Sequence, residues 1–176
     1  MKELYDVRRF GYGSLEIILI DFNKNNLDQF IKNDLNIQED HIKSSHFYDN
    51  RSEKDFEFHQ IRSFEEILSP KGTGNILLSE LNLGHTLNNV MIVFSFNEEC
   101  GDIVMNFPEE ELFSGENSET TLKAQKLIEY ILDIKKKYAI EKVRIGYEPA
   151  MDDDTCLVEI DKEMMDTNVI VSKLLA

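Results

Sequence analysis

The chain has 176 residues, with 34 acidic and 19 basic side chains, a net charge of -15 and an apolar fraction of 41%. This apolar fraction is enough for a buried core, so the composition excludes global disorder. The excess of negative charge excludes sequence-independent binding to phosphate backbones and docking to anionic membranes, because both need a basic face. We expect a single globular domain over residues 1–176, acting in the cytoplasm because no signal-peptide pattern opens the chain.

The first third of the chain predicts two strands, a short helix and a long connection. An almost unbroken apolar run over residues 15–22 predicts a buried strand. Asn26 has a Gln three residues later, the spacing of a capping box, which predicts the start of a short helix. Residues 36–54 are polar and predict a long surface connection. Alternating residues over 56–60 predict a strand with one buried face.

The middle of the chain predicts a second short helix and a β-hairpin. Ser63 stands three residues before a Glu and predicts a helix start. Residues 72–74 read Gly-Thr-Gly, lack the Gly-Lys-Ser/Thr ending of a phosphate loop, and predict a turn. The leucine-rich segment 75–83 leaves a helical turn and an irregular packed segment both open. Segments 90–96 and 103–107 flank a turn-rich linker with a Gly, which predicts a hairpin.

The last third of the chain predicts the longest helix, over residues 120–137, followed by strands over 143–147 and 156–160. A final helix is expected over 167–175, although its β-branched residues also leave a strand open. The core-facing positions of the long helix are Leu127, Ile131, Ile134 and Tyr138. These elements predict an α+β fold: a single mixed or mainly antiparallel sheet of about five strands, with the long helix packed on one face.

Positive charge is absent from a long central stretch, since no Lys or Arg occurs between Lys71 and Lys123. A second acidic group, Asp152 to Asp154, follows Glu148. Charges of one sign confined to part of a chain create a directional field, which attracts a basic partner. The acids of the central stretch are Glu80, Glu98, Glu99, Asp102, Glu109, Glu110, Glu111, Glu116 and Glu119.

Residues suited to catalysis or metal binding show no recognised pattern. The Asp triplet 152–154 resembles the start of a calcium loop, but Cys156 and Leu157 occupy the next positions, which do not fit such a loop. The four His residues lack metal-ligand spacing, and the two Cys residues are far apart in the chain. We therefore predict no catalytic residue, no cofactor and no resident metal.

An acidic α+β domain without a catalytic constellation resembles the immunity proteins of bacterial polymorphic toxin and contact-dependent inhibition systems. The segments to which the resemblance points are Phe107-Pro108-Glu109-Glu110-Glu111 and Tyr147-Glu148-Pro149 through Asp154. The resemblance implies that the protein binds a cognate toxin, often a basic nuclease, and blocks its active site or substrate groove. We expect a monomer or a weak homodimer.

The candidate partner-binding residues are acids and aromatic residues in three predicted loops. The acids are expected to gather on one exposed patch and to steer a basic partner, while two aromatic side chains supply buried contact area. The complete set is Glu98, Glu99, Asp102, Glu109, Glu110, Glu111, Phe113, Tyr147, Glu148, Asp152, Asp153 and Asp154. The alternatives are a plain solvated face, a small enzyme with a site of scattered His and acids, a DNA mimic, and an oligomeric regulatory protein.

Overall fold

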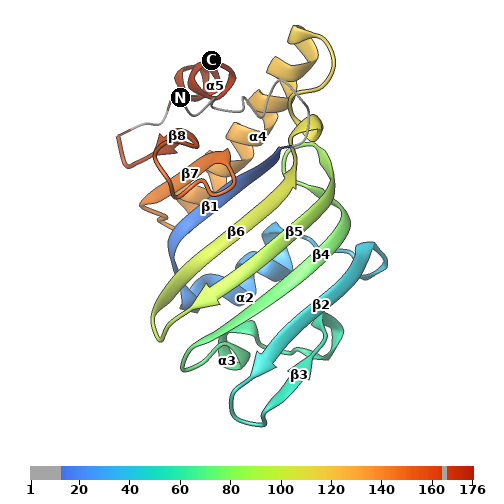
Figure 1. Cartoon of the computed structure of the whole chain (residues 1–176). Helices are drawn as coiled ribbons and strands as arrows, with labels where there is room; N and C mark the ends of the chain where they lie inside the picture. Colours follow the sequence, from blue (N-terminus) through green and yellow to red (C-terminus); the bar gives the residue numbers. More distant parts are fainter. Residues whose placement is uncertain (1–12, 164–165) are drawn as a thin grey trace, which may run out of the picture.

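The structure is a computed structural model that describes residues 13–163 and 166–176. Its strands form one eight-stranded sheet in the order β3-β2-β4-β5-β6-β1-β7-β8, and each pair of neighbouring strands is antiparallel (Figure 1). The predicted α+β class with an antiparallel sheet is confirmed. The predicted number of about five strands is wrong, because segments that predicted other structures also join the sheet.

Along the chain, groups of consecutive strands are separated by helical segments. The strands are β1 (Ser14–Asn23), β2 (Ile42–Asp49), β3 (Lys54–Phe56), β4 (Gly72–Asn82), β5 (Thr86–Phe96), β6 (Cys100–Pro108), β7 (Lys142–Tyr147) and β8 (Cys156–Ile160). The α-helices are α2 (Leu27–Gln29), α3 (Phe64–Ile67), α4 (Asn117–Lys137) and α5 (Thr167–Leu175). The other helical segments are the 3-10 turns η1 (Lys24–Asn26), η3 (Glu39–His41), η4 (Phe58–Gln60) and η5 (Glu109–Glu111) and the π-helical segment η2 (Phe30–Asp34).

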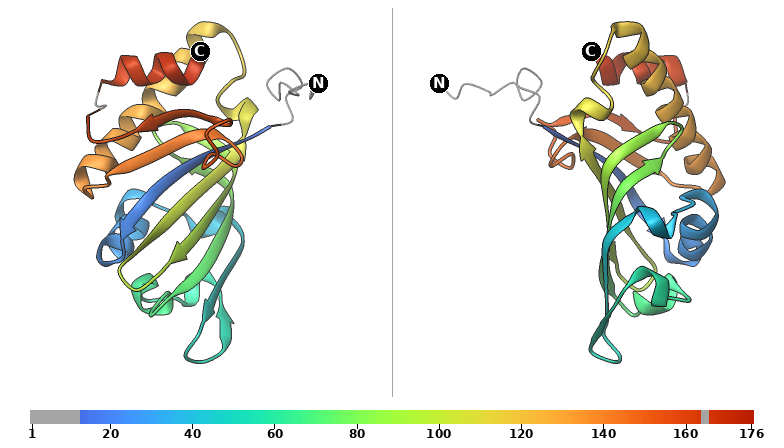
Figure 2. Two further views of the ribbon diagram at one scale, coloured as in Figure 1. Left: turned by 60° about the vertical axis from the view of Figure 1, so that its left-hand side comes forward. Right: turned by 90° about the vertical axis from the view of Figure 1, so that its right-hand side faces the viewer.

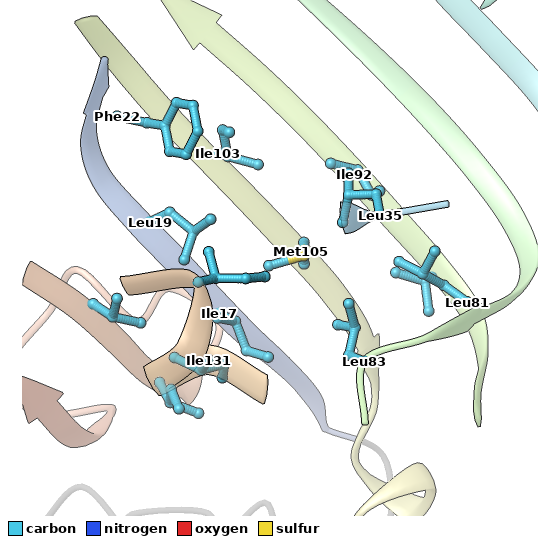
Figure 3. Close-up of a cluster of buried hydrophobic side chains, with 14 of the residues drawn as sticks. Ile17, Leu19, Phe22, Leu35, Leu81, Leu83, Ile92, Ile103, Met105 and Ile131 are labelled. Atoms are coloured by element: carbon cyan, nitrogen blue, oxygen red, sulfur yellow. The ribbon is translucent and has the colours of Figure 1, made fainter. Parts of the chain in front are cut away.

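The inner face of the sheet consists of alternate residues of each strand, because successive side chains of a strand point to opposite faces. In β1, Ile17 is paired with Met105 of β6 and with Ile145 of β7. All three side chains are buried. Figure 3 shows Ile17 and Met105 in the same apolar cluster as Ile131 of α4. Removal of this apolar surface from water provides the main driving force for the packing of α4 on the sheet.

The helices cover one face of the sheet. In Figure 2, α4 and the segments around α2 and α3 lie on the same side of the strands, and α5 packs against α4. In the described part of the chain no helix lies on the opposite face, where the loop between β7 and β8 (residues 148–155) covers one region (Figure 1). The predicted core positions of α4 are all buried: Leu127, Ile131, Ile134 and Tyr138.

Two strands occur where the sequence predicted other structures. Residues 36–54, predicted as a surface connection, contain β2, in which Ser45 and Phe47 are buried and the residues between and beside them face outward. The segment 75–83 belongs almost entirely to β4, and the turn predicted at 72–74 is the beginning of the same strand. Only one face of β2 is buried, and its outer residues are polar. A prediction based on composition therefore assigns the segment to a surface connection.

Two further local predictions need correction. In place of a strand over residues 56–60, the chain has the end of β3 and the turn η4. The helical segment after β1 is capped by Asn23, whose side chain accepts the backbone N–H two residues later at 2.9 Å. Asn26 already has a helical backbone conformation and makes no capping hydrogen bond. Ser63 does cap α3, since its hydroxyl accepts the backbone N–H three residues later at 3.3 Å.

The other predicted elements are present with small differences at their ends. Residues 15–22 lie in β1, and the hairpin segments are β5 and β6. The long helix begins at Asn117, three residues earlier than predicted. The last segment, for which a strand was also open, is the helix α5. None of the described helices combines the length and apolar character needed to cross a membrane.

Candidate partner-binding surface

The predicted partner-binding acids lie at two opposite ends of the sheet. Residues 97–102, which we call the hairpin end, form the turn between β5 and β6 and the start of β6 (Figure 1). The acids that follow Pro108 lie beyond the other end of β6. Asp102 and Pro108 are six residues apart in an extended strand, which corresponds to about 20 Å. The expected single patch is therefore divided, because the two loops flank one strand.

The start of β1 brings the other two predicted loops together. The backbone carbonyl groups of two consecutive residues, Gly13 and Ser14, accept hydrogen bonds from the N–H groups of Glu109 and Glu148, each at 3.0 Å. The turn η5 and the loop between β7 and β8 are thus neighbours in space, although they are far apart in the sequence. We call residues 109–113 and 147–154 the acidic end.

Two of the predicted residues at the acidic end are buried. The Glu109 carboxylate accepts hydrogen bonds from the phenol of Tyr147 at 2.8 Å and from the backbone N–H of Gly13 at 3.2 Å. Glu109 is 3% exposed and Tyr147 is 7% exposed. The ring of Tyr147 lies 6.4 Å from the ring of the half-buried Phe113, measured between centroids. In this structure Glu109 and Tyr147 hold the acidic end together and present little surface of their own.

Glu111 also has an internal role. Its carboxylate accepts hydrogen bonds from the backbone N–H of Asn88 at 3.0 Å and from the side-chain amide of the same residue at 3.1 Å. These contacts attach η5 to the beginning of β5. Glu111 therefore stabilises the position of the loop, and its charge is only partly available to a partner.

The loop between β7 and β8 is held on the outer face of the sheet by two side chains. The Glu16 carboxylate in β1 accepts the backbone N–H of Ala150 at 2.9 Å. The Arg144 guanidinium in β7 donates to the carboxylates of Asp153 at 2.6 Å and Glu159 at 3.1 Å. Asp153, a predicted steering residue, thus has an internal cationic partner that compensates its charge.

The remaining predicted acids provide the uncompensated charge at the two ends. Asp102 is half-buried, and one of its carboxylate oxygens accepts the backbone N–H of Asp21 at 3.0 Å. The others are exposed and form no salt bridge with any residue in 13–163 or 166–176. They are Glu98 and Glu99 at the hairpin end, with Glu110, Glu148, Asp152 and Asp154 at the acidic end. Both ends therefore attract a cationic surface.

Sequence reasoning missed the surface between these two ends. It consists of nine outward-facing residues of β4, β5 and β6, and we call it the open face. Its three rows across the strands are Thr73–Ser95–Asp102, Asn75–Val93–Val104 and Leu77–Met91–Asn106. Each of these residues is exposed or half-buried, and Asp102 alone carries a charge.

The shortage of charge on the open face is unusual for this chain. Charged residues make up 30% of the sequence and are normally concentrated at the surface, so about three would be expected among nine outward-facing positions. The alternation of buried and uncharged outward positions in β4, β5 and β6 is the sequence signal for this surface. It becomes readable only when the strand register is known, because neighbouring positions on the face are distant in the sequence.

A hollow of about 420 Å³ lies where the open face meets the acidic end. Met91 and Asn106 of the open face line it, together with Pro108 and the exposed Glu110. The side-chain oxygen of Asn106 is buried and has no hydrogen-bond partner among the described residues. A buried acceptor without a donor raises the free energy of the folded state. Because this oxygen is shielded from solvent, the acceptor that an incoming group meets at the hollow is the exposed carboxylate of Glu110.

The residues that the structure describes contain no group of three or more His, Cys, Asp or Glu side chains placed to hold a metal ion. In the Asp triplet, Asp153 is bound by Arg144, while Asp152 and Asp154 are exposed.

Comparisons with known proteins match this chain to a family and to several solved structures. A family model described as PABL017 Cdi1I immunity protein matches residues 13–163. One chain in the crystal structure of the toxic C-terminal tip of CdiA from Pseudomonas aeruginosa in complex with an immune protein matches with a TM-score of 0.61 and 17% identity, over 84% of this chain and 94% of that chain. The Pseudomonas aeruginosa T6SS protein PA0821 gives a TM-score of 0.47 and 9% identity, over 82% of this chain and 48% of that chain. Curated protein sequences gave no match. The first structural match shows a shared fold.

Proposed function

We propose, from the premise that this chain belongs to the PABL017 Cdi1I immunity protein family, that it binds a cognate toxin and keeps that toxin inactive. The observation that carries this proposal is the extent of the family match, which spans residues 13–163 and so includes the whole eight-stranded sheet. The fold shared with a chain of a toxin–immune protein complex supports the same function.

The charge distribution favours a basic toxin as the partner. The exposed carboxylates at the hairpin end and the acidic end would attract a cationic surface over long range and raise the association rate. Contacts formed after the encounter would set the dissociation rate and hence the lifetime of the complex. Nuclease toxins are one class with a suitable basic surface, since they must bind a phosphate backbone.

Inhibition would arise from occupation of the toxin and not from chemistry performed on it. A non-catalytic inhibitor must be present in at least the same molar amount as its target. An enzyme that modifies the toxin would act at a much smaller amount and would leave a permanent change in the toxin.

The test first identifies the candidate toxin domain from the gene that neighbours the gene for this chain. Expression of that domain alone should stop growth, and co-expression of this chain should restore growth. In a titration of the purified toxin, inhibition should be complete at a one-to-one molar ratio, and toxin recovered from the complex by denaturation and refolding should be active again. Loss of growth despite co-expression, or inhibition at a small fraction of the molar amount, would contradict the proposal.

A further inference from the structure

We infer that the toxin docks on the open face of the sheet, and that the hollow beside Asn106 receives a Lys or Arg side chain of the toxin. This inference rests on the proposed function and goes beyond it, because it assigns the binding surface and the chemistry of the group that enters it. The open face is free of helices in the described structure and lies between the two acidic ends (Figure 1).

The composition of the open face fits the centre of a protein interface. Interface centres are depleted of charged residues and enriched in Met and other apolar side chains, while their rims are polar and solvated. The middle of the open face has Leu77, Met91, Val93 and Val104, all half-buried. The uncompensated acids stand at both ends of this area and would form its rim. The matching toxin surface would have an apolar centre and basic flanks.

The hollow explains how a basic side chain would be recognised. Met91 and Pro108 provide apolar contacts for the methylene groups of a Lys or Arg side chain. The exposed carboxylate of Glu110 lies at the same hollow and would accept hydrogen bonds from the cationic group. Both Lys and Arg present several N–H donors, which suits pairing with this carboxylate.

A second copy of this chain fits the open face poorly. The chain has a net charge of -15, and both ends of the open face are acidic. Two copies that met through this face would place carboxylates of one near carboxylates of the other in either relative orientation. Like charges brought together in an interface cost free energy, which favours a partner of opposite charge.

The docking surface can be tested by adding the same positive charge to opposite faces of the molecule. Val104→Arg and the exposed Ser95→Arg alter the open face, and Leu122→Arg alters an exposed apolar position on α4, on the helix-covered side. The probe is the purified toxin domain that the growth test identifies. Each open-face variant should raise the Kd at least about tenfold, whereas Leu122→Arg should change it less than about twofold. Thermal unfolding of each variant confirms that it is folded, and the exposed Ser95 provides the result if Val104→Arg does not fold.

The hollow has a test that separates binding from stability. Glu110→Gln removes the exposed carboxylate at the hollow and keeps a side chain of the same shape. The midpoint of urea unfolding should stay the same, because the side chain is exposed, while the Kd for the toxin increases several-fold. An unchanged Kd would show that the hollow does not receive a cationic side chain of the toxin.

The possible failures can be told apart. If the toxin binds the unmodified protein tightly and the two open-face variants bind equally well, the docking surface is wrong and the proposed function remains. If the toxin does not bind the unmodified protein, both proposals fail. If light scattering shows a dimer that Val104→Arg or Ser95→Arg separates into monomers, the open face is occupied by a second copy and the inference is overturned.

Discussion

A buried Lys side chain connects two loops at the level of single residues. Lys24 is 5% exposed, and its ammonium group donates to the backbone carbonyl of Leu68 at 3.0 Å, the hydroxyl of Ser69 at 3.2 Å and the carbonyl of Pro70 at 3.3 Å. Burial lowers the pKa of Lys24, since water no longer solvates the charge. The three oxygen acceptors replace that solvation and join the segment after β1 to the loop before β4.

Replacement of this cation should be costly. Lys24→Met should lower the free energy of unfolding by about 2–4 kcal/mol, because it leaves buried acceptors without a donor. The matched control is Lys32→Met, which removes an exposed Lys that donates to the carbonyl of Arg62 at 2.8 Å. The control should change the value by less than about 0.5 kcal/mol. Urea unfolding measures both, and equal losses in the two variants would contradict the role assigned to Lys24.

The raised pKa of Glu16 predicts a pH dependence of the free energy of unfolding that one substitution can isolate. Burial raises the pKa of the Glu16 carboxyl and nearby Glu148 adds to the increase, although the N–H of Ala150 favours the charged form. Above the ordinary pKa of 4.5 and up to the raised value, the folded state binds more protons than the unfolded state. The contribution of Glu16 to the free energy of unfolding therefore falls as pH rises through this window.

Glu16→Gln removes this titration and keeps an oxygen that can accept the N–H of Ala150. The free energy of unfolding of the variant, minus that of the unmodified protein, should therefore increase between about pH 4.5 and about pH 7. Urea unfolding at the two pH values gives this difference, and the other titrating groups cancel in the comparison. A difference that stays constant between the two pH values would mean that the carboxyl of Glu16 titrates normally.

Among the secondary-structure elements, the pairing of β2 with β4 depends on a glycine. Gly74 in β4 is paired with Phe47 in β2, and a Cβ atom added at Gly74 would lie 2.2 Å from the Phe47 ring. The fully buried ring covers the glycine and also contacts the rings of Phe64 and Phe94, with centroid distances of 5.3 and 5.8 Å. Gly74 therefore allows one aromatic side chain to connect β2, β4, β5 and α3.

Gly74→Ala should displace the Phe47 ring and lower the free energy of unfolding by about 1–3 kcal/mol. Thr73→Ala, at the exposed neighbouring position, should change it by less than about 0.5 kcal/mol. Chemical denaturation of the two variants provides the comparison. Equal stabilities would show that the ring can move without loss of packing.

Elements with one strong apolar signal could be predicted from the sequence, and elements that depend on distant partners could not. The apolar run of β1, the hairpin around Gly101 and the periodic apolar positions of α4 depend on local patterns. The strand β2 becomes recognisable only beside β4, where the alternation of Ser45 and Phe47 has a core to face. The predicted turn at 72–74 is a strand because Gly74 is used to admit a ring and not to reverse the chain.

The candidate surface shows the same limit. Acids could be located in the sequence, but not their partners: Asp153 is bound by Arg144, and Glu109 is bound by Tyr147. The open face could not be identified, because its rows combine residues from three strands and depend on their register. Sequence patterns identify charge and periodicity, while compensation and adjacency arise from the tertiary fold.

For the molecule as a whole, the distribution of charge predicts a kinetic effect. Glu148→Gln combined with Asp152→Asn removes two exposed charges from the acidic end and should lower the association rate constant for the toxin by about threefold or more, with little change in the dissociation rate constant. The decrease should be largest at low ionic strength, because salt screens long-range attraction.

The matched control removes the same number and types of charge from α4. Glu129→Gln combined with Asp133→Asn alters exposed acids on the helix-covered side of the molecule. This variant should associate faster than the acidic-end variant at the same ionic strength, as measured by stopped-flow fluorescence. Equal rate constants would show that total charge matters and its position does not.

The attachment of the loop between β7 and β8 affects how this end of the molecule can form a complex. Glu16 and Arg144 form hydrogen bonds with backbone groups of the loop, so Asp152 and Asp154 project from an ordered segment. Ordering a flexible residue costs about 1–2 kcal/mol in conformational entropy. A partner that meets this loop avoids that entropy loss, and rigid preorganisation of this kind increases affinity without adding a single intermolecular contact.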